Sequence, residues 1–398
     1  MRGIEISLGN AKMKKPSPAL ERKMECREPE FALHRPPFGE IVDYRKKFRK
    51  LKNIVVIGNG GSVTSFQALH GALAEKSGKR ATVLSTMEPF RVTRVKKENP
   101  RANTLVMPVS KSGNNTDMLE ASLQFLDYRM LAVTGGGALG KIAGIKGIPV
   151  IEHPDIAGRF SGMTASALAP AGICGLPVKE MFRGARKCYR GCAPSVEFRA
   201  NDAKKLAFAL YGWERRGFTE IFMPVYSSRL SEFLPLAGQL VHETLGKKGK
   251  GLSLLAGEAP EAQHHTLQRV FGGRRNAGIL FLREEKFREK MRLKVPREIR
   301  RVKLHHSFLK SLDGLPCEKS LEFDFLGVQK TAKGKGIPSA EIRVERVSAE
   351  SVGSLLAFLQ YFAFYSALLR GVNAFNQPSV EKSKKTSFEM RKHFAGKK

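Results

Sequence analysis

Small hydroxyl and amide residues occupy positions 110–117, in the order Ser-Lys-Ser-Gly-Asn-Asn-Thr-Asp. They follow a short apolar run that is typical of a buried parallel strand, and a helical pattern comes after them. The first N–H groups of a helix have no backbone partner, and the helix dipole favours negative charge at that end. The stretch therefore predicts an anion site suited to phosphate, although a helix cap with spare polar residues would show the same pattern.

A second turn with similar chemistry lies earlier in the chain. Residues 53–57 are β-branched or apolar after Asn53 and predict a strand, and Gly-Asn-Gly-Gly-Ser follows at 58–62. Glycines allow the backbone to approach an anion closely. The turn lacks the Lys-Ser/Thr ending of a P-loop, and its glycine spacing does not fit a dinucleotide site. Gly61 and Ser62 are therefore candidates for binding phosphate without a nucleotide.

Two further residues could act on a substrate that these turns hold. Arg159 stands behind a glycine at the start of a predicted helix, where it could point into a cleft or lie on the surface. Glu243 is placed at the expected C-terminal end of a helix, where the dipole disfavours a carboxylate. His264 and His265 stand at the start of another predicted helix, where they could serve as acid–base groups, metal ligands or polar caps.

The strands and helices that must position these residues predict an α/β fold. Strands alternating with helices argue for doubly wound parallel sheets, and the second half weakly repeats the first. We expect two similar subdomains, each with a parallel, five-stranded type of sheet flanked by helices in an αβα sandwich. The predicted strands are 53–57, 81–84, 106–109, 130–134, 148–151, 219–225, 278–282 and 321–326.

The same patterns divide the chain into five parts, of which the last contains a strongly apolar helix at 351–370. The expected parts are an N-terminal arm and lead-in at 1–45 that is loose over its first 30 residues, a first subdomain at 46–180, a helical connection at 181–217, a second subdomain at 218–345, and C-terminal helices with a basic tail at 346–398.

Composition narrows the class of protein. The 398 residues are 42% hydrophobic, enough for two packed domains. No uncharged apolar run predicts a membrane span, and the N-terminus lacks the apolar core of a signal peptide, so we expect a cytoplasmic protein. Five cysteines fit reduced thiols. Cys188 and Cys192 could lie one helical turn apart, but no second Cys/His pair stands at finger-like spacing, so we expect no metal.

The formal net charge of +32 invites a nucleic-acid interpretation. Basic residues cluster at 45–52, 283–303 and 382–398, but the charge is spread along the chain and no RNA-binding motif or zinc finger accompanies it. A solvated basic surface explains the charge as well, and such a surface would also attract an anionic substrate. We therefore do not expect nucleic acid as a partner.

Six short motifs, in this order, resemble those of the glucose-6-phosphate isomerase family, which is built from two sugar-isomerase (SIS) domains. The chain resembles a divergent, short member of archaeal or bacterial type, and it departs from the family pattern at Asn114, Asn115, Leu245 and Ser379. The matching pieces are Gly60-Gly61-Ser62, the residues 110–117 quoted above, Gly-Arg-Phe-Ser at 158–161, Glu-Thr-Leu-Gly-Lys at 243–247, Gln263-His264 with Gln268, and Asn-Ala-Phe-Asn-Gln-Pro-Ser-Val-Glu at 373–381 with Lys384.

The resemblance implies interconversion of glucose 6-phosphate and fructose 6-phosphate through a cis-enediolate, with no cofactor and no metal. It makes Glu243 the base that moves a proton between C2 and C1, and Arg159 the positive charge beside the enediolate oxygen. His264 and Lys384 would open the sugar ring. The residues implied to hold or adjoin the phosphate are Gly61, Ser62, Ser110, Lys111, Ser112, Asn115 and Gln377.

Two alternatives stay open. A bifunctional isomerase would also accept mannose 6-phosphate, and a non-catalytic SIS-domain sensor would need the serine turns without the four catalytic candidates. The resemblance also implies a homodimer in which His264 reaches the neighbouring site. The helix at 351–370 is expected to offer more apolar surface than one small domain covers.

Overall fold

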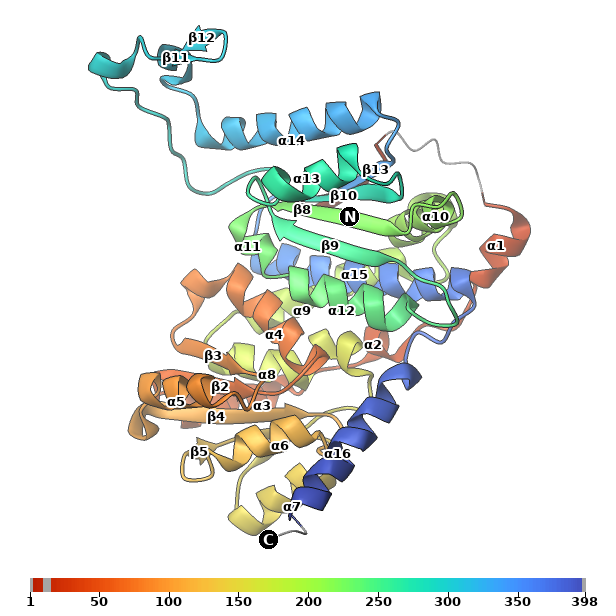
Figure 1. Cartoon of the computed structure of the whole chain (residues 1–398). Coiled ribbons are helices and arrows are strands. Elements are labelled where there is room, and N and C mark those ends of the chain that lie inside the picture. The colour runs from red at the N-terminus through yellow and green to blue at the C-terminus, as the bar shows by residue number, and fades with distance from the viewer. Residues whose placement is uncertain (1–2, 10–15, 396–398) are drawn as a thin grey trace.

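The computed structural model describes residues 3–9 and 16–395, apart from the side chain of Ser62. Two sheets lie in separate halves of the chain, with helices between and outside them (Figure 1). Every pairing within these two sheets is parallel except that of β1 with β13. The prediction of an α/β fold with helix-flanked parallel sheets is therefore confirmed.

The first sheet has the strand order β3-β2-β4-β6-β7, with β5 beside β4, and the second has the order β1-β13-β10-β8-β9. The strands are β1 (Ile4–Ser7), β2 (Asn53–Ile57), β3 (Arg80–Leu84), β4 (Thr104–Ser110), β5 (Arg129–Met130), β6 (Ala132–Thr134), β7 (Val150–Glu152), β8 (Glu220–Tyr226), β9 (Ser253–Glu258), β10 (Ala277–Glu284) and β13 (Ser339–Val344).

Helices connect these strands and cover both faces of each sheet (Figure 1). They are α1 (Pro18–Lys23), α2 (Glu30–Leu33), α3 (Phe38–Lys47), α4 (Gly61–Ala72), α5 (Pro89–Glu98), α6 (Thr116–Leu123), α7 (Gly137–Lys146), the 3₁₀ helix η3 (Gly158–Met163), α8 (Ala165–Ile173), α9 (Val178–Cys192), α10 (Asp202–Glu214), α11 (Ser228–Ser231), α12 (Leu234–Leu245), α13 (Gln263–Gly272), α14 (Cys317–Gly334), α15 (Ala349–Arg370) and α16 (Glu381–Ala395).

Helix α15 forms the centre of the molecule. A capping box at Ser348 and Ser351 begins it, and Gly371, with a φ of +66°, ends it. It is long and apolar enough to cross a membrane, but 94% of its apolar window is buried inside the protein, which is typical of a core helix. Because α9, α10 and α12 cover it, its apolar surface is buried within one chain and does not mark a dimer interface.

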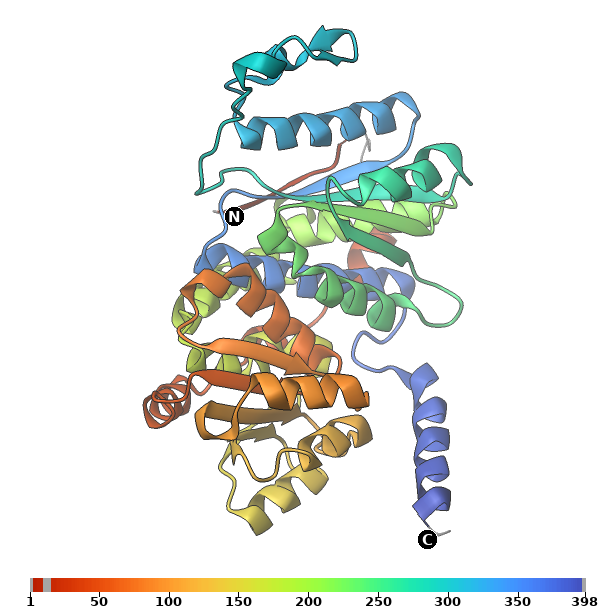
Figure 2. The ribbon, with the colours of Figure 1, turned by 60° about the vertical axis from the view of Figure 1, so that its left-hand side comes forward.

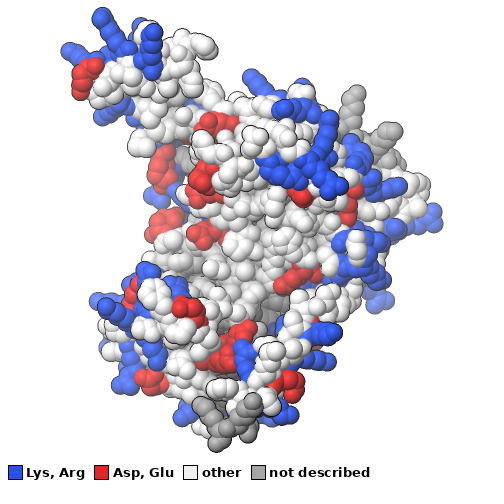
Figure 3. Space-filling view, viewed as in Figure 1, with Lys and Arg blue, Asp and Glu red and all other residues white. Residues whose placement is uncertain are grey.

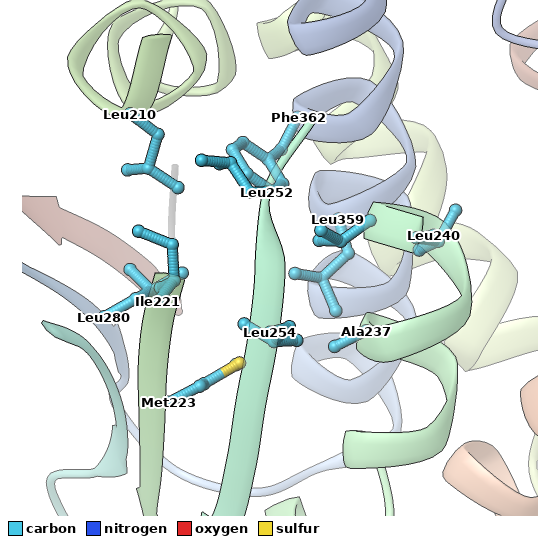
Figure 4. A pocket seen from close by; sticks show the side chains of 11 residues that line it. Leu210, Ile221, Met223, Ala237, Leu240, Leu252, Leu254, Leu280, Leu359 and Phe362 are labelled. Carbon is cyan, nitrogen blue, oxygen red and sulfur yellow. The ribbon is translucent and has the colours of Figure 1, made fainter. Parts of the chain in front are cut away.

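A small hollow remains where α15 and α12 pack on the second sheet (Figure 4). Its volume is about 10 Å³, and its walls are apolar. An apolar hollow of this size stays dry, so it belongs to the core and is no substrate site. The lining residues are Leu210, Ile221, Met223, Ala237, Leu240, Val241, Leu252, Leu254, Leu280, Leu359 and Phe362.

Two sequence predictions fail outside the core. Residues 4–7 of the expected loose arm form β1, which pairs antiparallel with β13, and Met24 is buried. Residues 321–326 lie in α14 instead of a strand. Its buried residues Phe325, Val328 and Ala332 recur at helical spacing, but a short apolar run alone does not separate helix from strand.

Two basic segments extend from the body. Residues 285–316 project beyond the second sheet and carry the small hairpin of β11 (Lys303–Leu304) and β12 (Ser307–Phe308) (Figures 1 and 2). Helix α16 lies beside the first half, where Arg391 pairs with Glu120 and Asp117 (Figure 2). Lys and Arg are scattered over both halves of the face shown in Figure 3 and over the projecting arm.

Candidate active site

The side chain of Arg159 joins the two halves of the molecule. It leaves the first half at η3 and is almost completely buried, with 1% of the residue exposed. A close approach places it: a Cβ added to Gly61 would lie 2.1 Å from the carbonyl carbon of Gly158. Only glycine at position 61 therefore allows α4 to start this near to η3. Gly61, expected at the phosphate, acts in the structure as the residue against which the Arg159 backbone packs.

All five N–H groups of the Arg159 guanidinium have an acceptor, which matches its full donor capacity. Burial lowers the pKa of Arg159, and the neighbouring Glu243 carboxylate raises it. The bonds are Nε to Thr244 Oγ1 (3.0 Å), Nη1 to Glu243 Oε2 (2.9 Å) and Gln377 Oε1 (2.9 Å), and Nη2 to the carbonyl oxygens of Ala374 (2.5 Å) and Asn376 (2.9 Å). The guanidinium thus connects η3, the end of α12 and the segment 373–377.

The Glu243 carboxylate is held from two sides. One oxygen accepts from Arg159, and the other accepts from Gln239 Nε2 at 2.8 Å, one helical turn earlier on α12. The Oε1 atom of Gln239 in turn accepts from Thr64 Oγ1 of α4 at 2.8 Å. The Glu243 side chain is still 34% exposed, so it can meet a ligand while its orientation stays fixed. An oriented, accessible carboxylate beside a buried cation can exchange a proton with a bound substrate.

Four participants in this arrangement were not predicted from the sequence. Gln239 could have been found from its spacing of four residues to Glu243 on one helix, and Thr244 is the next residue of the same motif. Lys247, the last residue of the Glu-Thr-Leu-Gly-Lys motif, is only 9% exposed and lies near Arg159 and Glu243. Thr64 carries no local signal, since it meets the site only through the contact of α4 with α12.

The predicted phosphate turn has the shape expected of strand, turn and helix. Ser110 Oγ accepts from the Gly113 N–H and Ser112 Oγ from the Asn114 N–H, both at 3.2 Å, while Asn115 Oδ1 caps α6. Gly113 has a φ of +65°, and a Cβ there would lie 1.8 Å from the carbonyl oxygen of Gly136. The side-chain oxygens are thus used to shape the turn at the start of α6.

Two other predicted phosphate residues have different surroundings. Lys111 Nζ pairs with the exposed Asp155 carboxylate at 2.6 Å. The structure joins Gln377 to Arg159 and so to Glu243. The Ser62 side chain lies outside the described part of the structure.

No hydrogen bond or ion pair among the described side chains joins the expected ring-opening pair, His264 and Lys384, to Glu243 within one chain. The end of α12 meets the start of β9, where the Leu254 N–H donates to His242 Nε2 at 2.9 Å. His264 follows the other end of β9, whose six residues span roughly 20 Å. His264 is exposed there, and Lys384 is exposed on α16 with its Nζ 2.9 Å from Glu381.

Metal-ligating groups do not gather in the described residues. None of their His, Cys, Asp and Glu side chains form a group of three or more that could hold an ion. The Sγ atoms of Cys188 and Cys192 lie 3.9 Å apart on α9, both buried in the core. This pair therefore packs as two small apolar side chains.

The arrangement of two helix-flanked parallel sheets is the SIS-type fold, which solved phosphosugar isomerases share. The structure superimposes on that of tagatose-6-phosphate ketose/aldose isomerase from Escherichia coli with a TM-score of 0.54 at 14% identity, over 91% of this chain and 98% of the other. A hypothetical protein from Thermus thermophilus gives a TM-score of 0.83 at 24% identity, over 94% and 91%. These likenesses define the fold.

Sequence similarity is more specific. The chain is 26% identical to a probable glucose-6-phosphate isomerase of Methanococcus maripaludis, over 88% of this chain and 81% of the relative. It is 25% identical to the glucose-6-phosphate isomerase of Methanocaldococcus jannaschii, over 89% and 88%. No protein-family model matches. The resemblance to the glucose-6-phosphate isomerase family is confirmed by these relatives.

Proposed function

We propose that this protein interconverts glucose 6-phosphate and fructose 6-phosphate, as a homodimer in the cytoplasm. The observation that carries the proposal is the Glu243 carboxylate, which Arg159 and Gln239 hold by one oxygen each while a third of the side chain stays exposed. Relatives named for this activity match along most of the chain.

In the proposed reaction, the phosphate binds at the turn 110–115 and the start of α6, where backbone N–H groups and the helix dipole attract it. Glu243 takes the proton from C2 of the open-chain aldose and returns it to C1 of the enediolate, while a proton passes from O2 to O1. The charge of Arg159 stabilises the negative oxygen that develops between these steps. Because all five donors of Arg159 are occupied, a direct bond to that oxygen requires release of one acceptor. Three of the acceptors are side chains, and Gln377 is the one of them that is neither the base Glu243 nor its neighbour Thr244.

Ring opening needs an acid and a base at the ring oxygen and O1. We assign them to Lys384 and to His264 of a second copy of the chain. The position of His264 supports this assignment, because β9, whose six residues span roughly 20 Å, separates the end of α12 from the start of α13 in its own chain.

Two other functions make different demands on the same residues. A bifunctional isomerase would also convert mannose 6-phosphate, and the space that the Gln377 side chain leaves beside the substrate would decide whether it can. A sugar-phosphate sensor needs the turn 110–115 but has no use for an oriented carboxylate beside a buried cation. The hydrogen bonds from Thr64 through Gln239 to Glu243 therefore favour catalysis.

The direct test supplies the purified protein with fructose 6-phosphate and couples the appearance of glucose 6-phosphate to a dehydrogenase. Glu243→Gln, purified in parallel, controls for isomerase carried over from the expression host. Turnover by the wild type and none by the variant is expected. If neither preparation turns over substrate while both bind it, the sensor function replaces the isomerase.

A further inference from the structure

Lys247 is a buried lysine that the proposed reaction does not use. It follows Gly246, which ends α12, and only 9% of the residue is exposed. Its Nζ donates to the carbonyl oxygen of Thr244 at 3.2 Å and to that of Asn373. The lysine therefore ties the end of α12 to the segment 373–377.

The same segment is held by Arg159. Its Nη2 donates to the carbonyl oxygens of Ala374 and Asn376, while Lys247 holds that of Asn373. Three carbonyls of one short, irregular segment thus point at two buried cations. Removal of one cation leaves part of this backbone without a partner, and an unpaired buried polar group is destabilising.

We propose that Lys247 is a positioning residue for the isomerisation. Lys247 fixes the segment 373–377 against α12. The carbonyls of this segment orient the Arg159 guanidinium, so Lys247 also fixes the position of that guanidinium beside Glu243. The proposal rests on the proposed function, and it concerns the backbone around Arg159 and no contact of Lys247 with substrate.

The charges around Lys247 support a role that depends on pH. Burial, and then the positive charge of Arg159, lower the pKa of Lys247 to about 8, while Glu243 opposes the shift. Arg159 from η3 and Glu243 from α12 are the charged groups that act on it, and residues 373–377 contribute carbonyls and no titratable side chain. The ammonium form therefore prevails below about pH 8, and its charge is lost as the pH rises further.

Lys250 offers a matched control. It lies three residues further along the same turn, and its Nζ also donates to a backbone carbonyl, that of Arg370 at 2.8 Å. That carbonyl belongs to the last residue of α15 and lies outside the segment 373–377. Lys250 is exposed, so its removal controls for the loss of a lysine–carbonyl bond in this turn that does not reach the segment 373–377.

The test compares Lys247→Met, Lys247→Arg and Lys250→Met with the wild type. In Lys247→Met, kcat for fructose 6-phosphate should fall by about tenfold to a hundredfold, which is the cost of a misplaced catalytic group, with KM little changed. Lys247→Arg should keep most of the rate and shift the alkaline decline of kcat above that of the wild type, since a guanidinium keeps its proton. Lys250→Met should behave as the wild type.

Hydrogen exchange of the amides of residues 373–377 gives a second measurement that needs no activity. Exchange should be faster in Lys247→Met than in Lys250→Met. Should Lys247→Met fail to fold, Lys247→Gln takes its place. Equal exchange in the two lysine variants, or a kcat in the Lys247 variant within about twofold of wild type, would overturn the inference. A wild type without isomerase activity would instead refute the proposed function, while the exchange comparison would still decide the role of Lys247.

Discussion

Arg159 Nη1 lies 2.9 Å from Glu243 Oε2, and the two side chains differ sharply in exposure, at 1% for the arginine and 34% for the glutamate. The cation is part of the core between the two halves, and the carboxylate is at its edge. Because the arginine also holds Gln377 and two backbone carbonyls, the base, the segment 373–377 and η3 share one buried charge. The site and the junction of the halves therefore depend on the same residue.

Replacing Arg159 should damage stability and activity together. Arg159→Lys keeps the charge but has three donors in place of a planar fork of five, so at least two acceptors lose their partner. Leaving a buried acceptor without a partner typically costs about 1–3 kcal/mol. We expect a lower urea midpoint and a large loss of kcat in Arg159→Lys. Arg391→Lys, on the exposed helix α16, is the matched control, and a near-normal urea midpoint in Arg159→Lys would contradict the prediction.

Replacing Glu243 should separate binding from turnover. Glu243→Gln keeps the size of the side chain and an oxygen that can still accept from Arg159, but it removes the proton acceptor. The rate should fall by at least about 10²–10⁴-fold, the usual contribution of a general base. Sugar-phosphate binding, measured by calorimetry, should persist. Glu261→Gln changes an exposed glutamate and serves as the control, and a Glu243→Gln variant with a near-normal rate would remove Glu243 from the mechanism.

The sequence pattern predicted the buried strands that precede the two turns more accurately than the strands at the edges of the second sheet. The buried strands β2 and β4 are continuous apolar runs that local pattern identifies. Strand β9 is largely exposed, and β1 is a four-residue strand whose pairing with β13 is decided by residues more than 300 positions away. Propensity carries no information about such a distant partner.

The site shows the same division. Glu243 and Arg159 were found because each stands in a motif, and the structure places the two side chains in contact, while their catalytic roles stay predictions. The use of all five donors of Arg159 depends on carbonyls of Ala374 and Asn376, which any residue type could supply. Backbone acceptors leave no mark in a sequence, so the bonds of Arg159 to residues 374 and 376 were not predictable from residue types.

The hollow in Figure 4 indicates where a large-to-small substitution in the core should lower the stability of the protein. Leu359 on α15 is 3% exposed and borders it, so Leu359→Ala would enlarge a space that the packing already fails to fill. Large-to-small changes of this kind cost about 2–5 kcal/mol. Urea unfolding should show that loss, whereas Leu123→Ala, at a leucine that is 51% exposed, should change stability little. Equal effects of the two substitutions would show that the hollow does not weaken this region.

Subunit mixing tests whether two chains share each site. His264→Ala and Glu243→Gln should each be inactive, since each removes one catalytic group. In a heterodimer of the two variants, one site would combine an intact Glu243 with an intact His264 from the other chain, and part of the activity should return. Light scattering of the wild type should first give the mass of a dimer. An absence of recovery, after subunit exchange has been confirmed by differently tagged chains, would count against a shared site.

The choice between glucose 6-phosphate and mannose 6-phosphate should depend on Gln377. The two sugars differ at C2, so an enzyme that uses both must let the enediol turn about its C2–C3 bond, which requires space. The Gln377 side chain is held by its bond to Arg159 Nη1 at 2.9 Å, and Pro378 restricts the backbone that follows. We therefore expect kcat/KM to favour glucose 6-phosphate strongly in the wild type.

Two variants separate the volume of Gln377 from its hydrogen bond. Gln377→Thr removes both, and it should gain activity on mannose 6-phosphate if crowding prevents the rotation. Gln377→Leu keeps similar bulk but cannot accept from Arg159, so it should not gain mannose 6-phosphate activity if crowding prevents the rotation. Comparable wild-type kcat/KM values for the two sugars would refute the predicted preference. A gain of mannose 6-phosphate activity in both variants would instead assign selectivity to the bond between Gln377 and Arg159, since only that feature is lost in each.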